Sequence, residues 1–154
     1  MDVLHENIVN GFCFSTDKAK LDIPYIHHFL SQKSYWAIGI PLDIVKRSIE
    51  NSLSFGIYLE NRQVGFARVI TDLATFGYLA DVFVDEEYLG KGISKDLMQF
   101  IFSLTELKPF RRMILATRDA HGLYTKYGFK PLAAPDRFME LHNPDVYKKM
   151  DLNS

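Results

Sequence analysis

The chain has little cysteine and no long apolar run. Cys13 is the only cysteine, so an intramolecular disulfide is impossible and a reducing compartment is expected. No apolar run reaches the ~18 residues of a membrane span, and residues 1–6 lack the basic region and apolar block of a secretory signal. We therefore expect a cytoplasmic protein in which Cys13 is a structural thiol rather than a nucleophile.

An excess of charge of one sign is also missing. Lysine plus arginine number 18 and aspartate plus glutamate 19, which gives a net charge of −1. This balance lacks the basic footprint of proteins that bind nucleic acid or anionic membranes, so we predict neither partner. His27 and His28 have no metal-ligand spacing, and we predict no metal. The length and composition indicate a single domain over residues 1–154.

Apolar patterning predicts an α/β fold with the order strand, two helices, three strands, helix, strand, helix and two strands. An antiparallel meander followed by a β–α–β crossover gives a mixed, mostly antiparallel sheet with helices on both faces. The predicted strands are residues 11–16, 55–59, 64–70, 76–84, 112–116 (of the buried type), 129–133 and 138–141. The predicted helices begin at Asp22 with Pro24, at Pro41, after a glycine loop, and at Asp119, the last ending at Gly128.

The glycine loop is the most informative segment, because it joins a predicted strand directly to a helix. It reads Leu89-Gly90-Lys91-Gly92-Ile93-Ser94. A helix N-terminus carries unpaired N–H donors and partial positive charge, and glycine lets the backbone approach a ligand, so the unit suits a phosphate. A Walker-type loop is absent, and the third glycine of a dinucleotide fingerprint is missing. Another kind of phosphate ligand is therefore expected.

Two motifs resemble the signatures of one superfamily. Residues 82–94, Val-Phe-Val-Asp-Glu-Glu-Tyr-Leu-Gly-Lys-Gly-Ile-Ser, resemble the acyl-CoA-binding motif of the GNAT N-acyltransferases. Residues 120–129 resemble the second signature, Ala-x-x-Leu-Tyr-x-x-x-Gly-Phe. The motif order and the element order are also similar, so the resemblance spans about residues 11–141. It implies a GNAT fold and transfer of an acetyl group from acetyl-CoA to a primary amine of a small molecule or a protein, by direct attack in a ternary complex.

The resemblance also implies which residues hold acetyl-CoA. Phe83 and Val84 would pair with the pantetheine arm through their backbone. The pyrophosphate would be held by the amides of Leu89, Gly90, Lys91, Gly92, Ile93 and Ser94, with the side chains of Lys91 and Lys95 nearby. Leu89 departs from the usual Arg or Gln and supplies no side-chain donor, Ser94 could cap the helix, and Thr117 stands where the family often has Asn.

The resemblance implies that Tyr124 is the general acid. A phenol with a pKa of ~10 is protonated at neutral pH and can donate to a thiolate, which suits this role. Aromatic packing is the alternative. Tyr78 stands near the usual base position, which favours a water-relayed proton. Asp81 is an alternative base, with pairing to Arg68, Arg118 or a lysine as the equal alternative. The weaker base candidates are Asp72, Asp119 and His121.

Acceptor specificity is expected from the first two helices and the turn around Asp72. The residues expected to line that side are Tyr35, Trp36, Arg68, Asp72 and Tyr78, and the carboxylates of Asp72 and Asp81 would suit a cationic amine. Two other functions stay open. One is a non-catalytic CoA-binding regulatory module, and the other is an acyltransferase with a different acyl donor or acceptor. A homodimer is compatible with an apolar closing strand.

Overall fold

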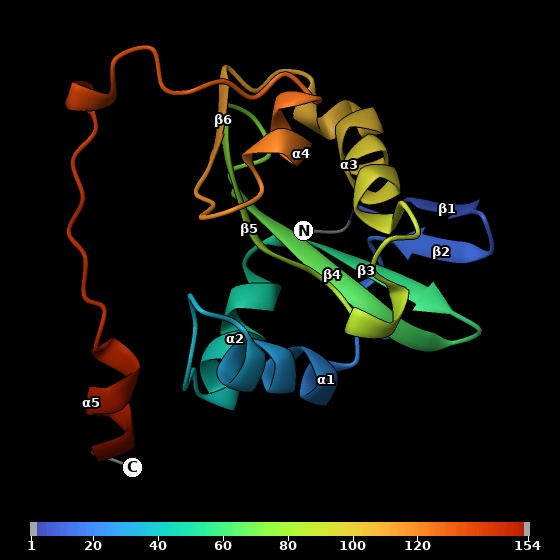
Figure 1. Cartoon of the computed structure of the whole chain (residues 1–154), viewed down its shortest axis with the longest axis horizontal. Coiled ribbons are helices and arrows are strands. Elements are labelled where there is room, and N and C mark those ends of the chain that lie inside the picture. Colours follow the sequence, from blue (N-terminus) through green and yellow to red (C-terminus); the bar gives the residue numbers. More distant parts are fainter. Residues whose placement is uncertain (1–2, 153–154) are drawn as a thin grey trace. The chain divides into compact units, whose positions relative to one another are not determined.

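The computed structural model describes residues 3–152 (Figure 1). The chain divides into two compact units, Met1–Ala116 and Thr117–Ser154. A single domain over residues 1–154 therefore stays a prediction. Within the described range, no helix combines the length and the apolar character needed to cross a membrane. The first unit contains the sheet, and the second contains the short helices α4 (His121–Thr125), η5 (Pro135–Arg137) and α5 (Val146–Leu152).

The sheet has six strands in the order β1-β2-β3-β4-β5-β6. Neighbours from β1 to β5 are antiparallel, and β5 and β6 are parallel, which confirms the predicted mixed and mostly antiparallel sheet. The strands are β1 (Glu6–Val9), β2 (Phe12–Ser15), β3 (Leu53–Leu59), β4 (Arg62–Thr71), β5 (Phe76–Val84) and β6 (Arg112–Leu115).

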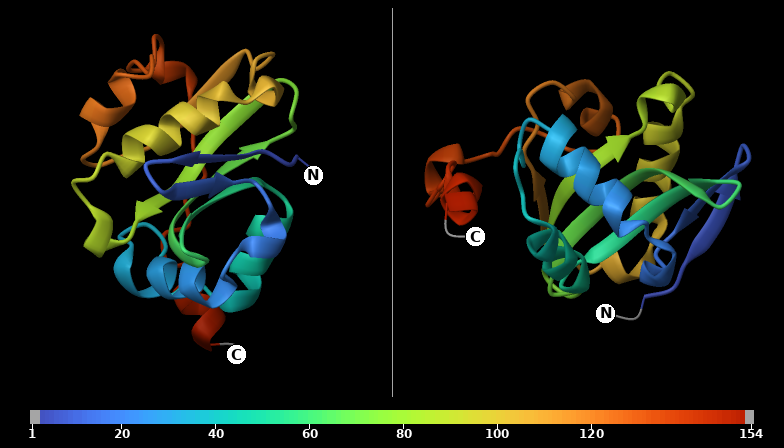
Figure 2. Two further views of the ribbon diagram at one scale, coloured as in Figure 1. Left: turned by 90° about the vertical axis from the view of Figure 1, so that its right-hand side faces the viewer. Right: turned by 90° about the horizontal axis from the view of Figure 1, so that it is seen from below.

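Helices cover both faces of this sheet, as predicted. Figure 2 shows α3 (Ile93–Ser103) against one face, and α1 (Ile23–His28) with α2 (Leu42–Glu50) against the other. A π-helical turn, η2 (Phe29–Lys33), continues α1. Single 3-10 turns form η1 (Lys18–Lys20), η3 (Glu86–Tyr88) and η4 (Thr105–Leu107).

Local signals set the helix starts as the sequence indicates. The Asp22 side chain accepts a hydrogen bond from the Tyr25 N–H at 3.1 Å, and Pro24 lies in the first turn of α1. Pro41 stands directly before α2. On the other face, Leu97 is fully buried, and the ring of Phe100 lies 5.9 Å from that of Phe14 in β2. This packing fixes α3, and with it the glycine loop, against the sheet.

Several predicted elements are wrong. Residues 129–133 and 138–141 form no strand, and the side chain of Met139 is 97 % exposed. Apolar alternation in these segments is not matched by a sheet partner, and pairing is what makes a strand. Residues 112–115 do form β6, but Arg112 is exposed and the rest of the strand is only partly buried, because β6 is the edge strand.

The structure also adds a strand that the sequence reading missed. β1 pairs with β2 across the two-residue turn Asn10-Gly11, in which both residues have positive φ, 53° and 84°. Asn-Gly is the preferred sequence for such a hairpin turn. The turn was therefore readable from the sequence, whereas the short polar strand before it was not.

Candidate functional site

The β5 strand continues beyond its parallel partner. The β5–β6 ladder runs from the pair Phe76 and Arg112 to the pair Leu79 and Leu115. From Ala80 to Val84, β5 has no strand partner on the β6 side within residues 3–152. Backbone N–H and C=O groups require hydrogen-bonding partners, so this free edge can accept an extended ligand. The predicted pantetheine contacts, Phe83 and Val84, both lie on it.

A bulge interrupts β5 just where the free edge begins. Phe66 pairs with Phe83 and Arg68 pairs with Ala80, so Asp81 and Val82 together lie opposite Ala67 alone. Asp81 has a φ of 54°, which is the left-handed region. In a regular strand, the residue after Ala80 would point away from the face that carries Arg68. The bulge re-aims Asp81 onto that face instead.

Asp81 uses both carboxylate oxygens there. Arg68 Nε donates to one oxygen at 2.6 Å, and Trp36 Nε1 donates to the other at 2.7 Å. The side chains of Asp81 and Arg68 are only 9 % and 16 % exposed. The structure therefore contains the predicted pairing with Arg68. A general base would have to receive its proton on an oxygen that already accepts a hydrogen bond, and this role of Asp81 stays a prediction.

The glycine loop ends at the N-terminus of α3, an eleven-residue helix. Gly90 and Gly92 have φ values of 80° and 77°, and no heavy atom would lie within 4 Å of a Cβ added at either position. Gly92 is the N-cap residue, and no side chain caps the helix. Ser94 lies inside the helix, so the expectation that its hydroxyl caps α3 is wrong. The uncapped amides at this helix start suit an anion.

Two cationic side chains lie against the ring of Tyr88, the residue before the glycine loop. Lys91 Nζ and Arg62 Cζ each lie 5.6 Å from the ring centroid of Tyr88 in η3. Arg62 comes from the start of β4 and also contacts the Tyr88 hydroxyl. The sequence reading missed Arg62, because the contact joins residues 26 positions apart. Arg62 also forms an ion pair with Glu87 at 3.5 Å, so Lys91 is the cation beside Tyr88 that has no ion pair within residues 3–152, and Leu89, which is 60 % exposed, supplies no charge.

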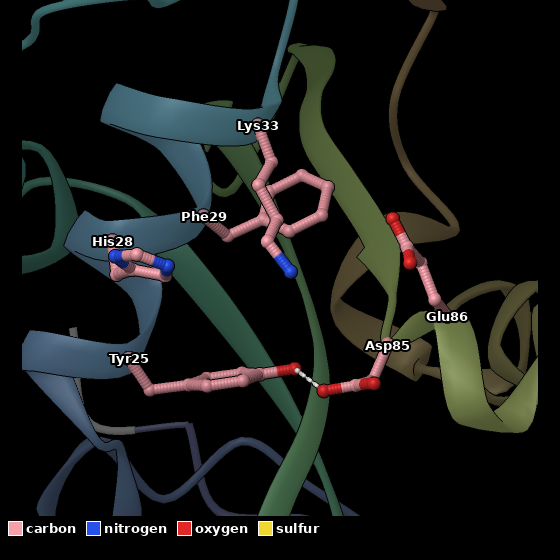
Figure 3. Close-up of a pocket in the computed structure, with 6 residues that line it drawn as sticks. All are labelled: Tyr25, His28, Phe29, Lys33, Asp85 and Glu86. Carbon is pink, nitrogen blue, oxygen red and sulfur yellow. Dashed lines mark hydrogen bonds between the residues drawn. The ribbon is translucent and has the colours of Figure 1, made fainter.

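A small polar pocket adjoins the end of β5 (Figure 3). It is lined by Tyr25, His28, Phe29, Lys33, Asp85 and Glu86. The Tyr25 hydroxyl donates to Asp85 Oδ2 at 3.3 Å, and burial and the Asp85 charge raise the pKa of Tyr25, so it stays a donor. In Figure 3 the Lys33 ammonium group points into the space in front of both carboxylates. No sequence signal indicated this pocket, whose residues come from α1, η2 and the segment after β5.

The residues predicted for the acceptor side are only partly brought together. Trp36 contacts Asp81, and its ring lies 4.9 Å from that of Tyr35 in a T-shaped arrangement. Tyr78 pairs with Ile70, two residues along β4 from Arg68, so Tyr78 and Arg68 share one face of the sheet.

Asp72 belongs to a separate local structure. Its carboxylate accepts from the Thr75 hydroxyl at 2.6 Å and from the backbone N–H groups of Thr75 and Ala74. These bonds, the Thr75 hydroxyl first, hold the pKa of Asp72 well below its usual range. The carboxylate closes the β4–β5 turn, and its contribution to acceptor binding stays a prediction.

The second unit contains Tyr124 in α4. Tyr124 is buried, its ring lies 5.9 Å from that of Phe129, and the Phe129 N–H donates to the Tyr124 carbonyl. Gly128, with a φ of 94°, makes the turn between them. The second signature is thus a helix–turn unit in which Tyr124 packs on Phe129. Its role as general acid stays a prediction.

The start of α4 differs from the prediction. Ala120, not Asp119, is the N-cap residue, and the Thr117 hydroxyl accepts a hydrogen bond from the Ala120 N–H at 3.0 Å. Asp119 therefore does not cap the helix, because the N-cap residue is Ala120 and no side chain makes a capping hydrogen bond. His121 is the exposed first residue of α4. Among residues 3–152, no group of three or more His, Cys, Asp or Glu side chains could hold a metal ion.

Comparison with known proteins identifies relatives of this chain. A family model described as an acetyltransferase (GNAT) domain matches residues 50–131. A Gibberella zeae protein named as an acetyltransferase is 31 % identical over 135 residues, covering 75 % of this chain and 76 % of that protein. A crystal structure of a Xanthomonas campestris acetyltransferase of the GNAT family is 51 % identical, with a TM-score of 0.86, covering 88 % and 96 % of the two chains.

A third relative shares the fold at low identity. It is a GNAT acetyltransferase from Elizabethkingia anophelis with acetyl-CoA bound, 18 % identical, with a TM-score of 0.60 over 88 % of this chain and 92 % of that one. The family model covers more than half of the present chain and includes the free edge of β5, the glycine loop and Tyr124. On this match and the agreement of sheet and loop, the chain belongs to the GNAT family of acetyltransferases and is an acyltransferase.

Proposed function

We propose that the protein transfers the acetyl group of acetyl-CoA to a primary amine of a small molecule or a protein, by direct attack in a ternary complex. The observation that carries this proposal is the free edge of β5 from Ala80 to Val84, which leads into the uncapped start of α3. A pantetheine arm carries amides that can pair with such an edge, and a pyrophosphate suits the helix N-terminus. The acetyl-CoA bound to the Elizabethkingia relative supports the choice of donor.

The loop residues would hold the pyrophosphate mainly through the backbone. The amides from Leu89 to Ser94 would supply donors, and the side chains of Lys91 and Lys95 would add positive charge. Phe83 and Val84 would pair with the pantetheine arm, and an N–H of the same edge would polarise the thioester carbonyl. Donor binding therefore requires both glycines to keep their left-handed conformation.

The reaction needs proton transfers at the substrate ammonium, at the leaving thiolate and at the new amide nitrogen. A lysine-like ammonium, with a pKa of ~10.4, is neutral in only about one molecule in 10³ at pH 7, so a proton must first leave through water near Tyr78. The amine nitrogen then attacks the acetyl carbon, the C–N bond forms and the C–S bond breaks. The leaving thiolate takes a proton from the Tyr124 hydroxyl, the amide nitrogen loses its second proton to solvent, and solvent returns a proton to the Tyr124 phenolate.

The acceptor would lie on the sheet face that carries Arg68 and Tyr78, beside the aromatic pair Tyr35 and Trp36. Asp72 would reach it only by giving up bonds within its own turn. We further propose that the enzyme acts in the cytoplasm. A homodimer stays a prediction, to be tested by light scattering.

Calorimetric titration with acetyl-CoA, alongside NADH and ATP, tests this function. We expect saturable binding of acetyl-CoA alone, followed by release of CoA in a screen of amine acceptors. Failure to bind acetyl-CoA at ~1 mM, the upper end of ordinary substrate concentrations, would refute the proposal. Binding without turnover on any amine or alcohol would instead favour the CoA-binding regulatory module, which the missing donor at Leu89 makes the second candidate. Turnover with a longer acyl-CoA or a hydroxyl acceptor would assign a different acyl transfer.

A further inference from the structure

We infer that Arg68, Asp81 and Trp36 form one positioning cluster, which connects the acceptor-side loop of residues 34–40 to the bulge of β5. Asp81 is its centre and acts as a positioning residue rather than a base. The inference deepens the proposed function and rests on it, because the strand concerned is the one expected to bind the acyl donor.

The two side chains that contact Asp81 come from different elements of the first compact unit. Arg68 lies on β4, across the sheet from the bulge, and Trp36 lies in the loop between η2 and α2, 45 residues before Asp81 in the chain. The Arg68 and Asp81 side chains are largely buried, so removing the carboxylate would leave a guanidinium group shielded from water without its anion. The carboxylate therefore connects the loop to both paired strands at the bulge.

The cluster is expected to stabilise the backbone conformation of the bulge. Asp81 is a non-glycine residue at a φ of 54°, a conformation that persists only where surrounding contacts enforce it. These contacts are the two hydrogen bonds to its side chain and the strand pairs on either side of the bulge. Without the two hydrogen bonds the strand can relax toward regular pairing, which would move the edge from Ala80 to Val84 where the pantetheine arm is expected. Loss of the carboxylate should therefore weaken donor binding although both carboxylate oxygens are engaged by protein side chains.

A second chain of contacts joins the same loop to the far side of the bulge. The Trp36 ring lies 6.5 Å from that of Phe29, and Phe29 stacks on Phe83 of β5 with centroids 3.8 Å apart. Trp36 is thus linked to Asp81 before Val82 and, through Phe29, to Phe83 after it. If donor binding shifts this stretch of β5, the surroundings of the Trp36 ring, which is 42 % exposed, should change as well.

Trp36 is the only tryptophan of the chain, so its fluorescence reports this cluster directly. The test variant is Asp81→Asn, which keeps the size and one acceptor oxygen but turns an NH₂ group toward Arg68 or Trp36. The matched control is Asp43→Asn, the same change at an exposed position of α2. Emission spectra of the free proteins are compared first, and acetyl-CoA is then titrated by fluorescence and by calorimetry.

We expect the wild-type emission to change saturably with acetyl-CoA. Asp81→Asn should show red-shifted emission without ligand and acetyl-CoA affinity at least tenfold weaker, and the control should match the wild type. Trp36→Phe, which keeps a ring but loses the donor, should also weaken acetyl-CoA binding in calorimetry. If Asp81→Asn fails to fold by circular dichroism, Arg68→Lys replaces it, since lysine keeps the charge but loses the guanidinium geometry.

Unchanged emission together with acetyl-CoA affinity within twofold of the wild type would overturn the inference. So would a variant that binds acetyl-CoA normally and loses only turnover, together with the acidic limb of its pH profile, because that is the behaviour of a lost base. Failure of the proposed function looks different: the wild type then binds no acetyl-CoA, whereas the emission shift between wild type and Asp81→Asn is still measured on the free proteins.

Discussion

Gly92→Ala should separate the stability of the glycine loop from its capacity to bind a ligand. Gly92 has a φ of 77° and no heavy atom within 4 Å of an added Cβ, so the methyl group meets no steric obstacle in the protein. The folded state is affected only through the backbone, because an L-residue in the left-handed region is disfavoured by about 1–2 kcal/mol. At roughly 2–4 °C per kcal/mol for a chain of this size, the melting temperature should fall by about 2–8 °C.

The effect on acetyl-CoA binding should be larger than this strain. The Cβ would stand on the open side of the loop, where the proposed pyrophosphate meets the amides at the start of α3. Displacing one phosphate oxygen loses a hydrogen bond to a charged group, worth about 1.5–3 kcal/mol. We therefore expect affinity to fall by a factor of about 10 to 150, since 1.4 kcal/mol corresponds to tenfold.

Gly11→Ala is the matched control, because Gly11 has a φ of 84°, lacks close neighbours in the same way and lies in the β1–β2 turn. Both variants should lose similar stability in thermal melts followed by circular dichroism. Only Gly92→Ala should lose acetyl-CoA affinity in calorimetry. Equal affinities for the two variants would refute the assignment of the loop as the phosphate site.

Three further outcomes follow from the structure. Tyr124→Phe should leave acetyl-CoA affinity unchanged and lower turnover by about 10²–10⁴ if the phenol protonates the thiolate, whereas unchanged turnover would leave Tyr124 as a packing residue. Leu97→Ala removes a fully buried side chain of α3 and should lower the free energy of unfolding by about 2–5 kcal/mol in urea titrations, and a loss below about 1 kcal/mol would contradict this packing. Burial raises the pKa of the Cys13 thiol, so its thiolate fraction at pH 7 is below that of a free thiol. Its alkylation by iodoacetamide should therefore be slower than that of glutathione and should accelerate with pH. Equal rates at pH 7 would refute the raised pKa.

Features set by neighbours in sequence could be predicted for this chain. The bounds of β5, Phe76–Val84, follow from a segment that begins and ends with aromatic and β-branched residues. The start of α1 follows from a capping aspartate and a proline in the first turn, and the glycine loop follows from two glycines before an amphipathic helix. Each of these depends on backbone sterics or hydrogen bonds within a few residues.

Features that depend on distant segments could not be predicted in the same way. The bulge at Asp81 is visible only through the register of β5 against β4, and the partners of its carboxylate lie 13 and 45 residues away. Sequence reasoning therefore left base and ion pair as equal alternatives. Residues 129–133 and 138–141 show the opposite case, in which strand-like patterning has no partner to pair with. Local propensity cannot supply the pairing that a strand requires.

The absent donor at position 89 is a smaller loss than the motif comparison suggests. A side chain that is 60 % exposed would contribute an ion pair of about 0–1 kcal/mol, because water and salt screen the charge. Hydrogen bonds from backbone amides to a charged phosphate are worth about 1.5–3 kcal/mol each, and the uncapped start of α3 offers several of them. Lys91 and Arg62 both lie against Tyr88 beside the loop, although Arg62 also pairs with Glu87. The backbone therefore outweighs the missing side chain, and Leu89 is compatible with tight donor binding as long as both glycines are kept.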